Sequence, residues 1–201
     1  PEMIEELQAL AQSEKMKRTI SENKDVLLNS PRQVTLGNPQ GDVTLVEFFD
    51  YNCGYCKRAL DDMMALIKSD PKLRVVLKEM PVLSQGSLEA AQVGAALTMQ
   101  DKSAKRYLDF HQKLLTGRGQ ADKARALAVA KEVGADMPRL EKDMASAEIK
   151  LALEESMKLA EVFGIQGTPS YVVGNEVLVG AVGLKELQSK INNARCGKAT
   201  C

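Results

Sequence analysis

The chain has 201 residues, of which 44% are hydrophobic and 27% charged, enough apolar material for the core of one ordinary domain that carries an insertion. Lysine plus arginine equals aspartate plus glutamate at 27 each, so no net charge draws the chain to nucleic acid or to an anionic membrane surface. Because no apolar run approaches about 18 residues and no signal-peptide pattern opens the chain, we expect no membrane insertion and expect that any export signal has been removed.

Residues 1–30 precede the first strand signal and carry apolar residues at helical spacing. We therefore predict an N-terminal helical extension, broken or continuous, that ends at Asn29-Ser30-Pro31. Its apolar seam consists of Met3, Ile4, Leu7 and Leu10. Two uses of this seam fit the sequence: it pairs with copies of itself, or it folds back onto its own domain.

A short strand is predicted at Val34–Leu36, and turn-forming residues separate it from Val43–Phe49, which we predict to be the central strand. Cys53-Gly54-Tyr55-Cys56 follows that strand. The next segment has a helical period, shown by Leu60, Met63, Met64 and Ile67. With a third strand at Arg74–Lys78, these elements predict a βαβ unit whose two strands are parallel.

The two cysteines of this motif stand where a strand ends and a helix begins. A thiolate at the first helical turn meets unpaired N–H groups and the positive end of the helix dipole, so we predict a lowered pKa for Cys53, the attacking sulfur. Cys56 lies one turn further on and is predicted to be the resolving thiol. The competing interpretation is half of a zinc site, but a second ligand pair would have to come from His111, Cys196 and Cys201, which do not have that spacing.

Glu47 is an ionisable residue inside the apolar central strand. Alternation along the strand places it on one face with Leu45 and Phe49, beneath the thiols. One hypothesis is that burial raises its pKa, so that it accepts the proton of Cys56 during resolution. The alternative is a glutamate at the strand edge that reaches solvent.

Between Ser84 and Gly164 the sequence has no strand signal and shows five successive helical periods, which predicts an all-helical insertion. The sheet is predicted to resume at Tyr171–Val173 and Val177–Val179, joined as a hairpin. Apolar residues from Leu184 to Ile191 indicate a closing helix.

Pro169 opens the strand that follows Thr168, where it has no ladder hydrogen bond to donate. From the residues alone, a trans peptide is expected there. At the C-terminus, Cys196 and Cys201 predict a small local disulfide or two free thiols, with a second redox pair or a Cu(I) site as the other hypothesis. His111, on an apolar-rich helical face, is predicted to be structural.

Together these features resemble the thioredoxin superfamily, and within it the bacterial periplasmic DsbA-like and ScsC-like disulfide oxidoreductases. The resemblance covers about residues 32–194 and is carried by Val46–Phe49 with the motif Cys53–Cys56, by Gly164–Pro169, and by Val177–Gly183.

The resemblance implies an α/β thioredoxin fold with an inserted helical domain, an N-terminal helical extension and a periplasmic location. The expected division of the chain is an extension at 1–30, a thioredoxin-like domain at 31–83 and 165–195, an inserted domain at 84–164 and a tail at 196–201. It also implies that the extension forms a homotrimer or another homo-oligomer, as in trimeric ScsC-like proteins.

For the site, the resemblance implies a cis Pro169 that faces the cysteines, backbone groups of Thr168 that meet a substrate peptide, and an acid, Glu47, under the resolving cysteine. The expected catalytic residues are Cys53, Cys56 and Glu47. The expected substrate-binding residues are Gly54, Tyr55, Thr168 and Pro169. No cofactor is expected beyond a redox-active Cys53–Cys56 disulfide.

The dipeptide between the cysteines indicates which reaction is favoured. Gly54-Tyr55 brings no cation to the thiolate, unlike the Pro-His of DsbA, and the motif together with Thr168 resembles the isomerase DsbC. We therefore expect a disulfide isomerase or reductase that acts on unfolded or misfolded secreted proteins and is recycled by a membrane redox partner. The alternatives are a DsbA-like oxidase and a copper-tolerance module that holds Cu(I) between Cys53 and Cys56.

Overall fold

The computed structural model describes residues 2–101 and 103–201. Within them, five strands form one mixed sheet in the order β1-β3-β2-β4-β5. The strands are β1 (Val34–Gly37), β2 (Val43–Phe49), β3 (Leu73–Glu79), β4 (Ser170–Val173) and β5 (Glu176–Val179). β2 runs parallel to β3, and the other three strand pairs are antiparallel. The predicted parallel βαβ unit and the C-terminal hairpin are confirmed.

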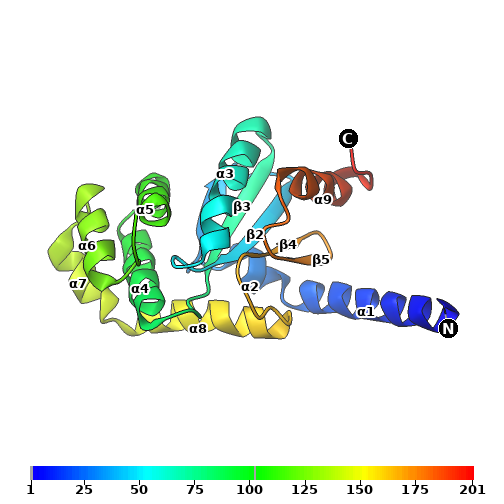
Figure 1. Ribbon diagram of the computed structural model, residues 1–201, viewed down its shortest axis with the longest axis horizontal. Helices are drawn as coiled ribbons and strands as arrows, with labels where there is room; N and C mark the ends of the chain where they lie inside the picture. The colour runs from blue at the N-terminus through cyan, green and yellow to red at the C-terminus, as the bar shows by residue number, and fades with distance from the viewer. Residues whose placement is uncertain (1, 102) are drawn as a thin grey trace.

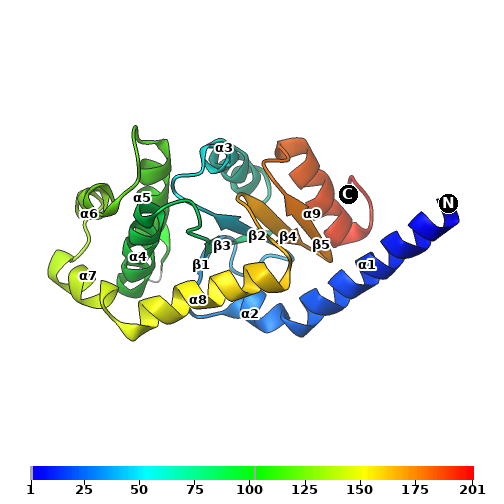
Figure 2. The ribbon, with the colours of Figure 1, turned by 60° about the horizontal axis from the view of Figure 1, so that its bottom comes forward.

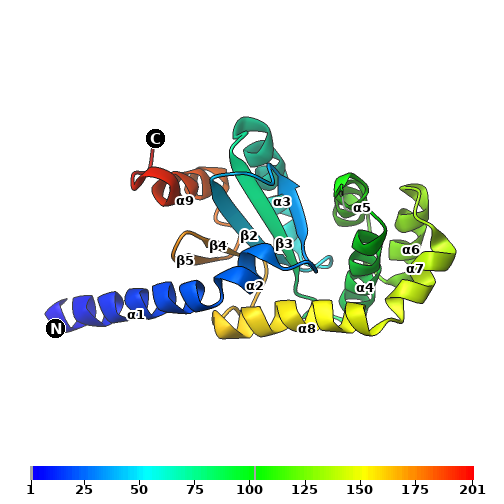
Figure 3. The same ribbon diagram turned by 180° about the vertical axis from the view of Figure 1, so that it is seen from behind.

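Helices cover both faces of the sheet (Figures 1 and 3). Along β2, Leu45 and Phe49 belong to a core shared with α3 (Gly54–Ser69) and α9 (Leu184–Cys196). Val46 and Phe48 point to the other face, where they pack with α2 (Lys24–Asn29) and α8 (Ala147–Val162). A strand that is buried on both faces has apolar residues at successive positions, which explains why β2 is a nearly continuous apolar run.

In the segment predicted as an all-helical insertion, the described residues form helices and connecting loops without a strand. The first four of these helices gather at one end of the molecule, and α8 runs back from them along the sheet (Figures 1 and 3). These helices are α4 (Gln85–Gln100), α5 (Lys105–Thr116), α6 (Lys123–Glu132), α7 (Met137–Met144) and α8. Ser84, Asp122 and Asp136 cap three of them by accepting a hydrogen bond from the N–H three residues on. The helical prediction is confirmed, whereas the boundaries assigned to the separate domains stay a prediction.

The N-terminal extension is α1 (Glu2–Glu22) followed by α2, and α1 projects away from the body (Figure 2). Ile20, near its end, is the one residue of α1 that is buried among those described, while the apolar seam at its start is exposed. The alternative in which that seam folds back onto its own domain is therefore wrong. α2 is fixed to the sheet because Lys78 and Arg74 of β3 donate hydrogen bonds to the carbonyls of Val26 and Leu28.

The chain closes with α9 and a tail in which Cys196 and Cys201 form a disulfide, as one of the sequence hypotheses held. Across the described residues, the helices are too short or too polar to cross a bilayer.

Candidate active site

Cys53 is the N-cap residue of α3, placed there by the three-residue loop that follows β2. Its sulfur accepts a hydrogen bond from the backbone N–H of Cys56 at 3.2 Å. The side chain of Cys56, that of Thr168 and the N–H groups of Cys56 and Tyr55 lower the pKa of Cys53 to about 6, against the opposing effect of burial. The strand–thiol–helix order that the sequence predicted is present, and so is its effect on acidity.

Cys56 occupies the first turn of α3 and is 1% exposed. Its hydrogen bond with Cys53 and its burial raise the pKa of this thiol. Near neutral pH, Cys53 is therefore ionised while Cys56 keeps its proton. The structure holds both residues as free cysteines.

Thr168 lies beside the sulfur of Cys53, and Pro169 follows it in the chain. The Thr168–Pro169 peptide is cis, so the trans form expected from the residues alone is wrong and the isomer implied by the family resemblance is present. The carbonyl oxygen of Thr168 is 3.2 Å from the Cys53 sulfur. β4 starts directly after the proline, and its pairing with β2 brings Ser170 opposite Phe48. The sheet therefore positions the proline loop beside the start of α3.

Glu47 is buried in the centre of the sheet with 3% exposure, between Leu77 of β3 and Tyr171 of β4. The alternative of a solvent-exposed strand-edge glutamate is wrong. Burial, followed by the negative charges of Cys53 and Asp62, raises the pKa of Glu47 to about 8. A carboxyl group with this pKa exchanges its proton near neutral pH, but its role as a proton acceptor stays a prediction.

Gly54 and Tyr55 lie on the outer surface of the motif. Space is open around Gly54, since a Cβ there would meet no atom within 4 Å apart from its chain neighbours and the backbone of its own helix, and Tyr55 is 60% exposed. The guanidinium of Arg58 lies over the Tyr55 ring, 5.2 Å from its centroid. This cation contacts the exposed Tyr55 ring and comes from the next turn of α3, three residues after Tyr55.

His111 of α5 is buried behind the loop that carries Cys53, where it packs edge-on against Phe49 and lies 3.3 Å from the Tyr51 hydroxyl. Burial lowers its pKa to about 3, so it stays neutral. Tyr51 in turn is hydrogen-bonded to Tyr107, which donates to Glu79. This buried network agrees with the structural role predicted for His111.

Two polar residues of the loop before Cys53, Asp50 and Asn52, make hydrogen bonds that the sequence did not reveal. Asp50 accepts the N–H of Cys53 through its backbone carbonyl at 3.1 Å. The one feature of the sequence that could have indicated them is their position, because two side chains able to form hydrogen bonds stand between a buried strand and the cysteine motif.

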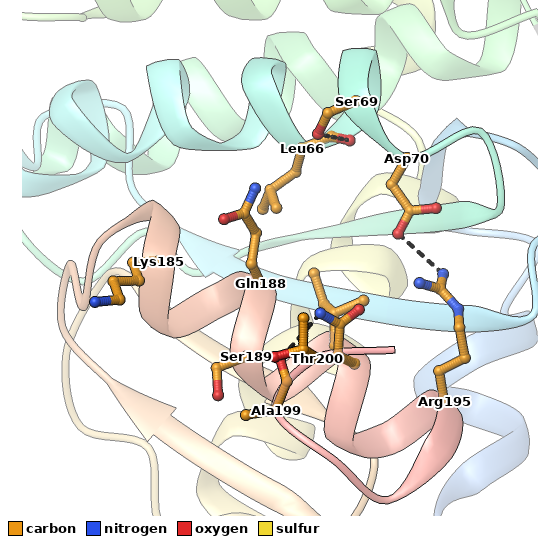
Figure 4. Close-up of a pocket in the computed structure, with 11 residues that line it drawn as sticks. Leu66, Ser69, Asp70, Lys185, Gln188, Ser189, Arg195, Ala199 and Thr200 are labelled. Atoms are coloured by element: carbon orange, nitrogen blue, oxygen red, sulfur yellow. Dashed lines mark hydrogen bonds and ion pairs between the residues drawn. The ribbon is translucent and has the colours of Figure 1, made fainter.

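A cavity of about 670 Å³ lies elsewhere, between the C-terminal half of α3 and α9 (Figure 4). Its wall includes an ion pair, at 2.9 Å, between Arg195 and Asp70. Neither cysteine of the motif lines it. Among the described residues, no group of three or more His, Cys, Asp or Glu side chains is arranged to hold a metal ion.

A family model described as DSBA-like thioredoxin domain matches residues 44–192. The chain belongs to this DsbA-like family. Among curated proteins, a protein named thiol:disulfide interchange protein DsbA from Bordetella pertussis is 26% identical over 147 residues, which cover 71% of this chain and 68% of that protein. A protein named Na(+)/H(+) antiporter NhaA 1 from Salinispora arenicola is 23% identical over 172 residues. This chain spans about a quarter of the length of the antiporters that it matches.

Solved DsbA-like structures share the fold over most of their length. A thioredoxin-like oxidoreductase from Silicibacter pomeroyi is 42% identical with a TM-score of 0.81, covering 86% of this chain and 98% of that one. The thiol-disulfide exchange protein alpha-DsbA2 from Wolbachia pipientis is 30% identical with a TM-score of 0.82, covering 91% and 97%. ScsC from Proteus mirabilis, in a transitional conformation, is 26% identical with a TM-score of 0.82, covering 98% and 90%. The α/β thioredoxin fold and the resemblance to DsbA and ScsC are confirmed.

Proposed function

We propose that this protein is a periplasmic thiol–disulfide interchange enzyme that acts on protein substrates through the Cys53–Cys56 dithiol, as an isomerase or reductase. One observation carries the proposal: the sulfur of Cys53 caps α3 at 3.2 Å from the N–H of Cys56, beside the cis-proline loop. Amide donors at a helix start stabilise a thiolate, which is the form of cysteine that attacks disulfides.

The first step is attack of the Cys53 thiolate on one sulfur of a substrate disulfide. A Cys53–substrate bond forms, the substrate S–S bond breaks, and the second substrate sulfur leaves as a thiolate. In isomerisation that thiolate, or another in the substrate, attacks a different disulfide of the substrate. A substrate thiolate finally attacks the mixed disulfide, which forms a new substrate disulfide and releases Cys53 as a thiolate. In reduction Cys56 loses its proton to Glu47 and attacks Cys53, which releases the substrate as a dithiol and leaves a Cys53–Cys56 disulfide.

The acidity of Cys53 supports a protein that is less oxidising than DsbA, in agreement with the proposed isomerase or reductase. A lower thiolate pKa stabilises the reduced dithiol and makes the disulfide more oxidising. The pKa of Cys53, about 6, lies between the values of about 7 for thioredoxin and about 3.5 for DsbA. We therefore infer an oxidant milder than DsbA. Recycling then needs a dithiol donor, and a membrane redox partner is the proposed source.

The exposed groups around the thiols suit an extended polypeptide. Tyr55 presents its ring to solvent, and the Thr168 carbonyl next to the sulfur is a backbone acceptor. An oxidising compartment agrees with the disulfide between Cys196 and Cys201, because exposed disulfides persist where thiols are not kept reduced.

The α1 seam supports self-association. Met3, Ile4, Leu7 and Leu10 are each at least 60% exposed, and apolar residues at this spacing are typical of a helix that packs on copies of itself. We propose a homo-oligomer formed through residues 1–30. In light scattering, Leu7→Glu with Leu10→Glu should reduce the mass to that of one chain. Val179→Glu, which charges an equally exposed apolar residue on β5, should leave the mass unchanged, and a single-chain mass for the unaltered protein would contradict the oligomer.

The activity is tested by two assays run side by side, refolding of scrambled ribonuclease and oxidation of reduced ribonuclease. High activity in the first with little in the second supports isomerase, and the reverse result selects the oxidase. Titration of Cu(I) into the reduced protein tests the copper alternative, which fails if ordinary chelators remove the metal. Cys53→Ser is the control for both assays and should be inactive in each.

A further inference from the structure

Asp50 joins the end of β2 to the inserted helices through a buried carboxylate with 1% exposure. One oxygen accepts hydrogen bonds from the N–H of Asn52 at 2.8 Å and the hydroxyl of Ser87 at 2.7 Å. The other accepts from the N–H groups of Val82 and Leu83 at 2.9 and 3.0 Å. Because a buried carboxylate is costly unless it is hydrogen-bonded, these four donors hold the loop, the segment after β3 and the first turn of α4 together.

Asn52, directly before the attacking cysteine, makes a second link to the inserted helices. Its side-chain amide pairs with the peptide of Ala121: the Asn52 Nδ2 donates to the Ala121 carbonyl at 2.9 Å, and the Ala121 N–H donates to the Asn52 Oδ1 at 2.7 Å. The same Nδ2 donates to the Ser87 hydroxyl at 3.0 Å. All the hydrogen-bonding groups of this amide therefore contact the segments that begin α4 and precede α6.

These two segments of the insertion are packed tightly where Asn52 meets them. A Cβ at Gly86 of α4 would stand 3.1 Å from the Ala121 carbonyl, so the glycine permits the close approach. Ala121 itself is 1% exposed. The loop therefore binds to a closely packed junction of the inserted helices.

We propose that Asn52 is a positioning residue through which the inserted helices fix the loop that carries the Cys53 sulfur. It does not touch the sulfur. Its displacement would move the adjacent Cys53, whose sulfur depends on the N–H of Cys56 at 3.2 Å. Hydrogen bonds weaken steeply with distance and angle, so a small shift of the loop reduces the stabilisation of the thiolate. This inference deepens the proposed function, and it rests on it.

The test compares Asn52→Ala with Asn38→Ala in the full chain. Asn38 is a matched control because it also joins a turn to a distant segment, donating to the Pro71 carbonyl and accepting from the Gln40 N–H. The thiolate absorbance of the reduced protein is followed against pH, together with the melting temperature. We expect Asn52→Ala to raise the titration midpoint of Cys53 by about 1 pH unit, whereas Asn38→Ala lowers the melting temperature without moving it.

Ser87→Ala is the second variant. It removes one partner of Asn52 and one of the four donors to Asp50, so it should raise the midpoint in the same direction. The inference is overturned if both variants titrate like the unaltered protein while melting at a lower temperature, because the link is then merely structural. A midpoint near 8.5 in the unaltered protein contradicts the proposed function itself, and the inference with it. The two failures are therefore distinguishable.

Discussion

The two cysteine pairs of this chain lie at opposite ends of helices. Cys53 caps the start of α3, buried, with a backbone N–H directed at its sulfur. Cys196 is the last residue of α9, and Cys201, its disulfide partner, has its sulfur 3.3 Å from the carbonyl oxygen of Asn192. Amide donors and the positive end of a helix dipole favour a thiolate, whereas the negative end disfavours it. A carbonyl oxygen lies close to a sulfur of each pair, since the Thr168 oxygen is 3.2 Å from Cys53, so the end of the helix is what distinguishes the two pairs. The position of each pair on its helix, more than its spacing in the sequence, therefore determines its chemistry.

The largest effect that separates the two pairs is expected from Cys53→Ser. Without the attacking sulfur, isomerisation of scrambled ribonuclease should fall by about a thousandfold or more. Cys56→Ser should instead accumulate a mixed disulfide with the substrate, visible on a non-reducing gel, because attack still occurs while resolution does not. Substantial activity in Cys53→Ser would assign the chemistry to another sulfur.

The acidity of Cys53 is checked by alkylation in a variant whose tail cysteines are serine. The rate with iodoacetamide should reach half its maximum near pH 6, the pKa of Cys53. The same shift predicts a direction for stability. Because the folded pKa is below the unfolded value of about 8.5, the reduced protein has its full stabilisation above that value and loses it as pH falls towards 6. Because Glu47 changes stability in the opposite direction over this pH range, the contribution of Cys53 is measured by denaturing the reduced protein and its Cys53→Ser variant at pH 5 and pH 9 and taking the difference. In the alkylation experiment, a half-maximal rate near pH 8.5 would contradict the lowered pKa of Cys53.

Glu47→Gln should change both the rate at which the mixed disulfide is resolved and the free energy of unfolding. If Glu47 takes the Cys56 proton, resolution of the mixed disulfide should slow by about tenfold at neutral pH. Its folded pKa, about 8, exceeds the ordinary value, so its contribution to stability is full below about pH 4.5 and is lost as pH rises to 8. The variant should therefore be more stable at pH 8, by roughly 1–3 kcal/mol in urea denaturation.

Glu79→Gln is the matched control for that experiment. Glu79 is another glutamate whose pKa is raised well above its usual value by burial, and it bonds to Tyr107 rather than facing the thiols. It should alter the pH dependence of stability and leave resolution unchanged. Equal slowing in both variants would show that Glu47 acts through the fold and does not accept the proton.

The sequence was sufficient for the elements that local chemistry determines. The apolar run of β2, the cysteine motif at a strand–helix junction and the helical periods of the insertion all correspond to what the structure contains. Placement of Glu47 within the sheet followed from the period-two alternation of the strand.

What the sequence did not reveal depends on contacts between distant segments. Asn52 meets Ala121, which is 69 positions away, and Asp50 meets Ser87. No local pattern encodes such pairs, because the approach of the segments depends on how the inserted helices pack. The attachment of α2 was likewise undetermined, since it depends on the bonds from Lys78 and Arg74 of β3 to Val26 and Leu28.

The smallest effect is expected from removing the tail disulfide with Cys196→Ser and Cys201→Ser. The bond closes a loop over a sequence separation of 5, for which chain entropy allows about 2 kcal/mol at most. The tail is exposed and holds to α9 mainly through the bond from Asn192 to the Ala199 carbonyl, so we expect a loss of about 1 kcal/mol and isomerase activity within about twofold of normal. Calorimetry and the ribonuclease assay measure both. If activity fell as far as in Cys53→Ser, the tail pair would be a second redox centre. The end of the helix at which a cysteine pair lies would then not explain the difference between the two pairs.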